Sequence, residues 1–154
     1  MLTWKWCTFQ SLTLQELYDL LALRQEVFTV EQKCTENDLD YHDQEAWHLL
    51  GYQDNKLVAY LRLFLEGKKY PDAVAFGRVL TDRSLRGQGV GHELMKQVLL
   101  FLQNQNNISP IIISAQLYLE KFYCSYGFEI MGEPYDEGGI PHIKMLKASS
   151  YAKK

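Results

Sequence analysis

The sequence predicts a single α+β domain built around a mixed β-sheet, and two observations support this class. Strand-like segments joined by short turns follow one another between residues 47 and 81, and strands connected in this way pair antiparallel. A strand–helix–strand unit spans residues 73–116, and such a connection usually makes its two strands parallel. The chain of 154 residues is long enough for one domain with its own core. We assign residues 1–150 to this domain and expect residues 151–154 to be a disordered tail.

The first third of the chain predicts a strand, a helix and a long acidic connection. Apolar and polar side chains alternate over residues 2–6, which is the period of a strand. Thr13 and Glu16 have the spacing of a capping box, and the apolar residues that follow lie on one face of a helix ending near Phe28. Residues 33–45 are polar and acidic, and so long a connection inside a compact domain is often functional.

The middle of the chain predicts the antiparallel strands and the helix that leads to a parallel one. The three strands cover Trp47–Tyr52, Leu57–Glu66 and Ala73–Thr81. A helix with apolar residues at helical spacing runs from about Gly89 to Gln103. The apolar run Ile111–Ile113 then suits a strand that is buried on both faces.

The last part of the chain predicts a short helix and a closing pair of strands. Aromatic residues at helical spacing precede Gly127, which is a typical C-cap. Two further strands cover Phe128–Tyr135 and Ile140–Leu146, joined through residues 136–139.

A glycine-rich loop separates the third of the middle strands from the helix that follows it. Gly87, Gly89 and Gly91 alternate there, so several backbone N–H groups at a helix start have no Cβ in front of them. This arrangement suits a phosphate, and Arg86 is either a further phosphate contact or a solvated charge. The loop lacks the lysine of a P-loop. It also has His92 or Leu94, depending on the starting glycine, where a dinucleotide fingerprint needs its last glycine.

Composition narrows the function classes further. A net charge of −3 gives no reason to expect a nucleic-acid or membrane partner. The three cysteines lie far apart without a CxxC pair, so we expect reduced thiols, no metal site and a cytoplasmic protein. The N-terminus lacks the pattern of a signal peptide, and the apolar runs are too short to span a bilayer.

Two motifs resemble the GNAT superfamily of N-acetyltransferases. Residues 86–91 match the (Arg/Gln)-x-x-Gly-x-(Gly/Ala) acyl-CoA loop of that family, and Gly77–Thr81 looks like the strand leading into it. Phe122–Phe128 resembles the second signature, an aromatic helix that ends in Gly-Phe. Residues 30–32 and 138–143, together with the acidic connection, are similar to the ElaA-like subgroup. Thr81 departs from the family pattern, because many members carry an apolar residue there.

The resemblance implies a fold and an activity. The fold is a three-layer α/β/α arrangement whose mixed, mostly antiparallel sheet is parallel at the central strand pair. The activity is transfer of an acetyl group from acetyl-CoA to a primary amine by direct attack in a ternary complex. The alternative is an acyl-CoA-binding sensor or pseudoenzyme without turnover. The protein would be a monomer or a homodimer and would need no metal.

The resemblance also implies roles for individual residues. The loop amides would hold the CoA pyrophosphate, and the backbone before the loop would pair with the pantetheine arm. Tyr123 would be the general acid at the sulfur, with a packed aromatic as the alternative. Gln116 would bond to the pantetheine amides or only begin the next helix. The cofactor-binding residues predicted in this way are Val79, Leu80, Thr81, Arg86, Gly87, Gln88, Gly89, Val90, Gly91, Gln116 and Tyr123.

The residues that meet the amine are less sharply predicted. His142 or Glu31 would act as the base or bind substrate, since imidazole titrates near neutrality and a carboxylate attracts an ammonium. A hydrogen-bonded structural role for His142 is the alternative, and His48 is expected to be structural. Asp38 and Asp40 in the acidic connection are further candidates for binding a cationic amine. The acceptor stays open between small polyamines, aminoglycosides, amino acids, peptide N-termini and protein lysines.

Overall fold

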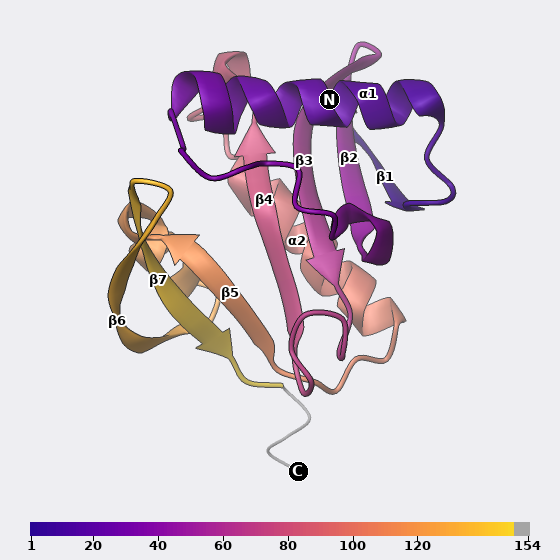
Figure 1. Cartoon of the computed structure of the whole chain (residues 1–154). Helices are drawn as coiled ribbons and strands as arrows, with labels where there is room; N and C mark the ends of the chain where they lie inside the picture. Colours follow the sequence, from indigo (N-terminus) through magenta and orange to yellow (C-terminus); the bar gives the residue numbers. More distant parts are fainter. Residues whose placement is uncertain (150–154) are drawn as a thin grey trace.

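A computed structural model describes residues 1–149, which form one seven-stranded sheet (Figure 1). The strand order is β1-β2-β3-β4-β5-β7-β6, and every neighbouring pair is antiparallel except β4–β5. The strands are β1 (Thr3–Thr8), β2 (Trp47–Gln53), β3 (Lys56–Phe64), β4 (Val74–Thr81), β5 (Ile111–Gln116), β6 (Glu129–Glu137) and β7 (Ile140–Lys147). The predicted mixed sheet with one central parallel pair is therefore confirmed. The tail predicted at residues 151–154 lies outside the described residues.

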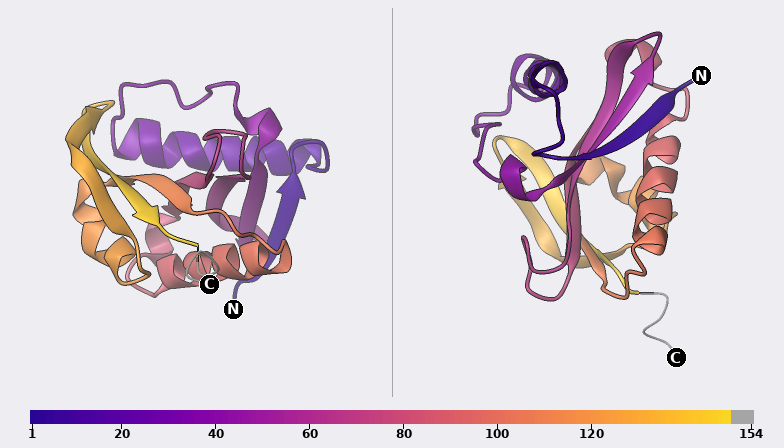
Figure 2. Two further views of the ribbon diagram at one scale, coloured as in Figure 1. Left: turned by 90° about the horizontal axis from the view of Figure 1, so that it is seen from below. Right: turned by 90° about the vertical axis from the view of Figure 1, so that its right-hand side faces the viewer.

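Helices cover both faces of the sheet and make three layers (Figure 2). The helices are α1 (Leu14–Arg24), α2 (Val90–Asn104) and α3 (Glu120–Cys124). Helix α1 lies on one face and α2 on the other, because the central strands are apolar on both sides. On β2, for example, Leu49 packs in the cluster that contains α2, and the next residue, Leu50, packs in the cluster that contains α1. Among residues 1–149, no helix is long and apolar enough to cross a membrane.

The first helix begins as predicted but changes its geometry before its end. The Thr13 hydroxyl accepts from the Glu16 amide at 3.0 Å and the Glu16 carboxylate accepts from the Thr13 amide at 2.9 Å, so the capping box is confirmed. The α-helix ends at Arg24 and continues as a π-helix over Gln25–Glu31. Because π-turns are rare and occur mostly at functional sites, this segment marks the part of the helix that faces the cleft described below.

The parallel pairing of β4 with β5 is short, and the sheet opens where this pairing ends. Only Val74 with Ile111 and Ala75 with Ile112 are paired, after which the two strands diverge (Figure 1). Strand β4 also contains a bulge opposite β3, where Arg78 takes a left-handed φ of 52°. The sheet is therefore open in its middle, with β4 on one side of the gap and β5 on the other.

The closing hairpin runs two residues further than predicted. The expected connection was residues 136–139, whereas β6 extends to Glu137 and pairs it with Ile140. Gly138 and Gly139 have φ values of 62° and 90°, and this left-handed pair makes a two-residue turn that allows pairing up to its edge. As a result, Glu137 is part of the edge strand β6, and it lines the cleft described below.

Candidate active site

The gap between β4 and β5 contains a cleft of about 340 Å³. Residues of both strands form its two walls, and the acidic connection, α3 and the β6–β7 turn close its ends. The edge of β4 that faces β5 has no strand partner beyond Ala75, whereas its other edge is paired with β3. The free edge can therefore bind an extended ligand through main-chain hydrogen bonds, as sheet edges do when they bind peptides. This edge includes the predicted residues Val79, Leu80 and Thr81.

The glycine-rich loop lies outside the cleft, directly after the strand that lines it. Gly87 and Gly89 both have φ of 80°, and a Cβ added to either would meet nothing within 4 Å. Within the described part of the chain, the backbone N–H groups of residues 87–91 donate to no acceptor. Gly91 differs, because a Cβ there would come within 3.4 Å of the Phe122 ring on α3. The loop thus presents a row of free donors at the start of α2, where the helix dipole also favours an anion.

Arg86 and Glu31 are brought together, away from the cleft lining. Two guanidinium nitrogens of Arg86 donate to the Glu31 carboxylate, and Arg83 lies 3.5 Å from the same carboxylate. Arg86 also donates to the Thr81 carbonyl at 3.3 Å. Arg86 is therefore not an isolated solvated charge; it links the π-helix to the end of β4. The hydrogen bond from Arg86 lowers the pKa of Glu31, so this carboxylate is ionised and engaged and is not positioned at the cleft as a base.

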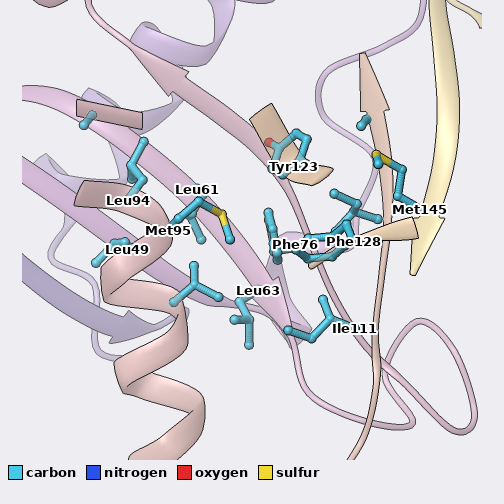
Figure 3. Close-up of a cluster of buried hydrophobic side chains, with 14 of the residues drawn as sticks. Leu49, Leu61, Leu63, Phe76, Leu94, Met95, Ile111, Tyr123, Phe128 and Met145 are labelled. Atoms are coloured by element: carbon cyan, nitrogen blue, oxygen red, sulfur yellow. The ribbon is translucent and has the colours of Figure 1, made fainter. Parts of the chain in front are cut away.

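Tyr123 lines the cleft, and its ring belongs to the cluster of buried side chains (Figure 3). Its ring packs 6.2 Å from that of Phe76 and 5.8 Å from that of Phe128, measured between centroids. Its side chain is 4% exposed, and its hydroxyl has no hydrogen-bond partner among residues 1–149. Burial raises the pKa of this hydroxyl, which therefore carries its proton at neutral pH. The ring is a packed aromatic, and the hydroxyl is a proton donor beside the cleft.

Gln116 connects the end of β5 to the helix on the other side of the cleft. Its side-chain amide donates to Gln32 at 2.9 Å, and both residues line the cleft. Gln32 follows directly on the π-helix. The pair therefore links the β5 wall to the segment that follows the π-helix.

His142 is buried in the wall formed by β5, β6 and β7, together with a carboxylate that the sequence did not reveal. Its Nδ1 lies 2.7 Å from the Ile140 carbonyl, and its Nε2 lies 3.3 Å from Glu137 Oε2. The other oxygen of Glu137 accepts from the Ser114 hydroxyl at 3.2 Å, and that hydroxyl also bonds to Tyr135. When Nδ1 donates to the carbonyl, Nε2 and the carboxylate are two acceptors that face each other. One proton shared between them would satisfy both, and an ammonium group beside the pair can donate to either.

Three aspartates of the acidic connection, Asp38, Asp40 and Asp43, are held by three arginines and are not free to pair with an amine. Arg24 donates to Asp38 at 2.9 Å and to Asp43 at 2.7 Å. Arg62 donates to Asp40 at 2.5 Å and to Asp43 at 2.9 Å. The expectation that Asp38 or Asp40 binds a cationic substrate is corrected here, because each already neutralises buried guanidinium groups.

The third arginine and a histidine complete this cluster. Arg78 donates to Asp38 at 2.9 Å and to Asp40 at 3.4 Å. Burial alone would raise the pKa of Asp40, but the Arg62 guanidinium outweighs it and holds that pKa well below its usual range. His48 is fully buried between the Tyr60 hydroxyl at 2.6 Å and the Asp43 carbonyl at 2.9 Å, as expected of a structural histidine. The sequence did contain a signal for this ion-pair cluster. Three arginines lie within apolar segments, and a buried arginine needs a carboxylate partner.

Known proteins share both the sequence and this architecture. The acetyltransferase (GNAT) domain family matches residues 11–149. An acyl-CoA N-acyltransferase from Pseudomonas aeruginosa superposes with a TM-score of 0.90 at 41% identity, over 96% of this chain and 100% of that one. Escherichia coli ElaA is 38% identical over 149 residues, 96% of this chain and 97% of its own. Its crystal structure superposes with a TM-score of 0.88, over 96% of this chain and 99% of that one.

The chain therefore belongs to the GNAT superfamily of N-acyltransferases, which use CoA thioesters. Within it, the chain is a member of the ElaA-like subgroup, and a UPF0039 protein of Synechocystis is likewise 40% identical over 94% of each chain. The resemblance drawn from residues 86–91 and 122–128 is thus confirmed, as is the three-layer fold.

Proposed function

We propose that this protein acetylates a primary amine, with acetyl-CoA or another short acyl-CoA as donor, by direct attack in a ternary complex. The divergence of β4 and β5 carries this proposal. It leaves an unpaired strand edge that runs from the cleft to the free N–H groups of residues 87–91. A thioester with a long amide-bearing arm and a pyrophosphate at its far end has the chemistry that these two features suit.

The residues present fit such a donor. The left-handed glycines leave open space over the loop amides, where an anion can approach without meeting a side chain. The β4 edge at Val79–Thr81 offers main-chain donors and acceptors to the pantetheine amides, and the Gln116 side chain adds another pair. When bound, the donor supplies an activated acyl carbon and a thiolate leaving group.

Two groups of the chain handle the protons. The His142–Glu137 pair takes the proton that the ammonium must lose, because an alkylammonium with pKa near 10.4 cannot attack. The amine nitrogen then forms the C–N bond while the C–S bond breaks, and Tyr123 donates its hydroxyl proton to the departing sulfur. The nitrogen loses its second proton to solvent as the amide forms, and solvent returns one proton to Tyr123. The His142–Glu137 pair then releases its proton to solvent, so each turnover yields the amide, the CoA thiol and one net proton.

Calorimetry and CoA release test this proposal with one matched pair of variants. Gly89→Ala places a methyl group over the loop amides at a residue with φ of 80°. Gly67→Ala adds a methyl group at a similar φ of 86° in the β3–β4 turn, away from the loop, and neither methyl group would meet an atom within 4 Å. We expect Gly89→Ala to weaken acetyl-CoA binding about tenfold or more, by loss of charge-assisted hydrogen bonds, and Gly67→Ala to leave it unchanged.

A measurement of turnover distinguishes the proposed transferase from an acyl-CoA-binding sensor. Release of CoA in the presence of amines supports the transferase, whereas tight binding with no release from any amine would leave only the sensor reading. A folded protein that binds no acetyl-CoA at millimolar concentration would exclude both.

A further inference from the structure

Some of the charged groups that line the cleft are paired with groups of opposite charge, and others are not. Arg62, Arg78 and the aspartates of the acidic connection neutralise one another through the hydrogen bonds given above. Two other features remain at the cleft without such compensation: the facing acceptors of Glu137 and His142, and the ammonium group of Lys69.

Lys69 is a cation with no carboxylate partner in the described part of the chain. Its Nζ lies 5.9 Å from the centre of the Phe64 ring and 6.0 Å from that of Tyr70, at the mouth of the cleft. Partial burial of this otherwise exposed residue lowers the pKa of Lys69 and the positive charge of Arg62 lowers it further, whereas the carboxylates of Glu137 and Asp40 raise it. A bound anion would supply the opposite charge with which this ammonium group is not paired.

The side of the cleft formed by the β6–β7 turn carries negative charge. Glu137 Oε2 and His142 Nε2 lie 3.3 Å apart at the cleft, so one N–H donor beside the pair can reach either acceptor. Glu36, which also has no ion-pair partner within residues 1–149, lies against the β6–β7 turn, since a Cβ on Gly138 would be 3.3 Å from its Cγ. The negative charge therefore gathers at this turn and the free positive charge at Lys69.

We propose that the acceptor is an amine that also carries a carboxylate, with its amino group at the Glu137–His142 pair and its carboxylate at Lys69. This proposal rests on the proposed N-acyltransferase function and names the substrate class of the same site. It disfavours polyamines and aminoglycosides, because a second ammonium group would meet the like charge of Lys69 in place of a carboxylate. Asp38 and Asp40, which the sequence offered as binders of a cationic amine, are engaged by arginines.

The test compares matched amines that differ only in the carboxylate. CoA release is measured with 4-aminobutanoate against 4-aminobutanamide, and with lysine against cadaverine. We expect a higher kcat/KM for the carboxylate-bearing member of each pair. Lys69→Gln should raise KM for those members about 10- to 100-fold, which is the range for a hydrogen bond between charged groups, and should leave the other members unchanged.

Two controls make the result specific. Lys68→Gln removes the neighbouring exposed lysine, which does not line the cleft, and should change neither series. Lys69→Arg keeps the charge and should restore most of the discrimination. Thermal shifts of the acyl-CoA-saturated protein with each amine report acceptor binding independently of turnover.

Distinct outcomes overturn the two proposals. Equal or better turnover of the amide and of cadaverine, or a Lys69→Gln variant with unchanged selectivity, would overturn the carboxylate assignment while the transferase stands. Acyl-CoA binding without turnover of any amine would overturn the proposed function, and the acceptor class would fall with it.

Discussion

Tyr123 combines a ring that belongs to the core with a hydroxyl that no described residue engages. Because burial raises the pKa of that hydroxyl, Tyr123 stays protonated throughout the pH range in which an amine is acetylated. Tyr123→Phe keeps the packing against Phe76 and Phe128 and deletes only the donor. We expect kcat to fall by roughly 10²-fold, at the lower end of general-acid effects, with acetyl-CoA affinity by calorimetry unchanged.

Tyr18→Phe is the control for this prediction, since Tyr18 is exposed on α1 and does not line the cleft. If Tyr123→Phe turned over as fast as the unchanged protein, the hydroxyl would have no part in the reaction and Tyr123 would be a packing residue alone.

Asp43 accepts hydrogen bonds from both Arg24 and Arg62, so a single carboxylate holds two buried cations. Burial would raise its pKa, but the two arginines outweigh burial and lower it. The unfolded chain therefore binds this proton more readily than the folded chain in acid. The stability that Asp43 contributes is complete above its unfolded pKa of about 3.9 and is lost as the pH falls through its lower folded pKa.

Asp43→Asn should lower the free energy of unfolding at pH 7 by about 3–5 kcal/mol, because it leaves two buried guanidinium groups short of charge. It should also flatten the decline of stability below pH 4, which urea unfolding at several pH values measures. Asp54→Asn, in the exposed β2–β3 turn, should do neither. Parallel pH curves for Asp43→Asn and the unchanged protein would contradict the assignment.

At the scale of elements, the β6–β7 turn and the segment that leads into the acidic connection are packed together through one glycine. Gly138 has φ of 62°, and a Cβ there would overlap Cys34 Sγ. The Thr35 amide also donates to the Gly138 carbonyl at 3.0 Å. This contact keeps the turn that holds Glu137 against the segment that borders the cleft.

Gly138→Ala should therefore cost more than a left-handed alanine alone. Gly132→Ala, at φ 83° with nothing within 4 Å, pays only the backbone cost of about 1–2 kcal/mol. We expect Gly138→Ala to lose about 1–3 kcal/mol beyond that, as overpacking does, in thermal or urea unfolding. Combining it with Cys34→Ala should recover much of the extra loss. If the losses of unfolding free energy from Gly138→Ala and Cys34→Ala simply added, the two residues would not compete for space.

Across the whole molecule, the divergence of β4 and β5 leaves the two halves of the sheet joined by only two residue pairs, and a bound acyl-CoA would contact elements on both sides. At a concentration about 100 times its Kd, such a ligand stabilises the folded state by about 2.7 kcal/mol. For a domain of this size we expect Tm to rise by roughly 5–10 °C. Hydrogen exchange should slow at residues 87–91 and along β4, and should not change in β1. Stabilisation with protection elsewhere would place the ligand at another site.

Much of the fold followed from local patterns. The Thr13 capping box, the antiparallel middle strands and the glycine-to-helix transition depend on neighbours in sequence, and each was confirmed. The π-turn after Arg24 and the two-residue turn at Gly138 were missed. The first is set by packing rather than by helical period. The second needs the backbone conformation of two glycines, which spacing alone does not give.

In the candidate site, too, contiguous motifs were predicted from the sequence and contacts between distant residues were not. The sequence by itself determined the family, the glycine-rich loop and the aromatic helix with Tyr123, because each of these motifs is contiguous in the chain. Only the tertiary structure decided which charges are free. Arg86 meets Glu31 across 55 positions, Arg78 meets Asp38 across 40, and Glu137 meets Ser114 across 23. An ion pair is a property of distance in space, so the acceptor end of the cleft emerged only when the strands were brought together.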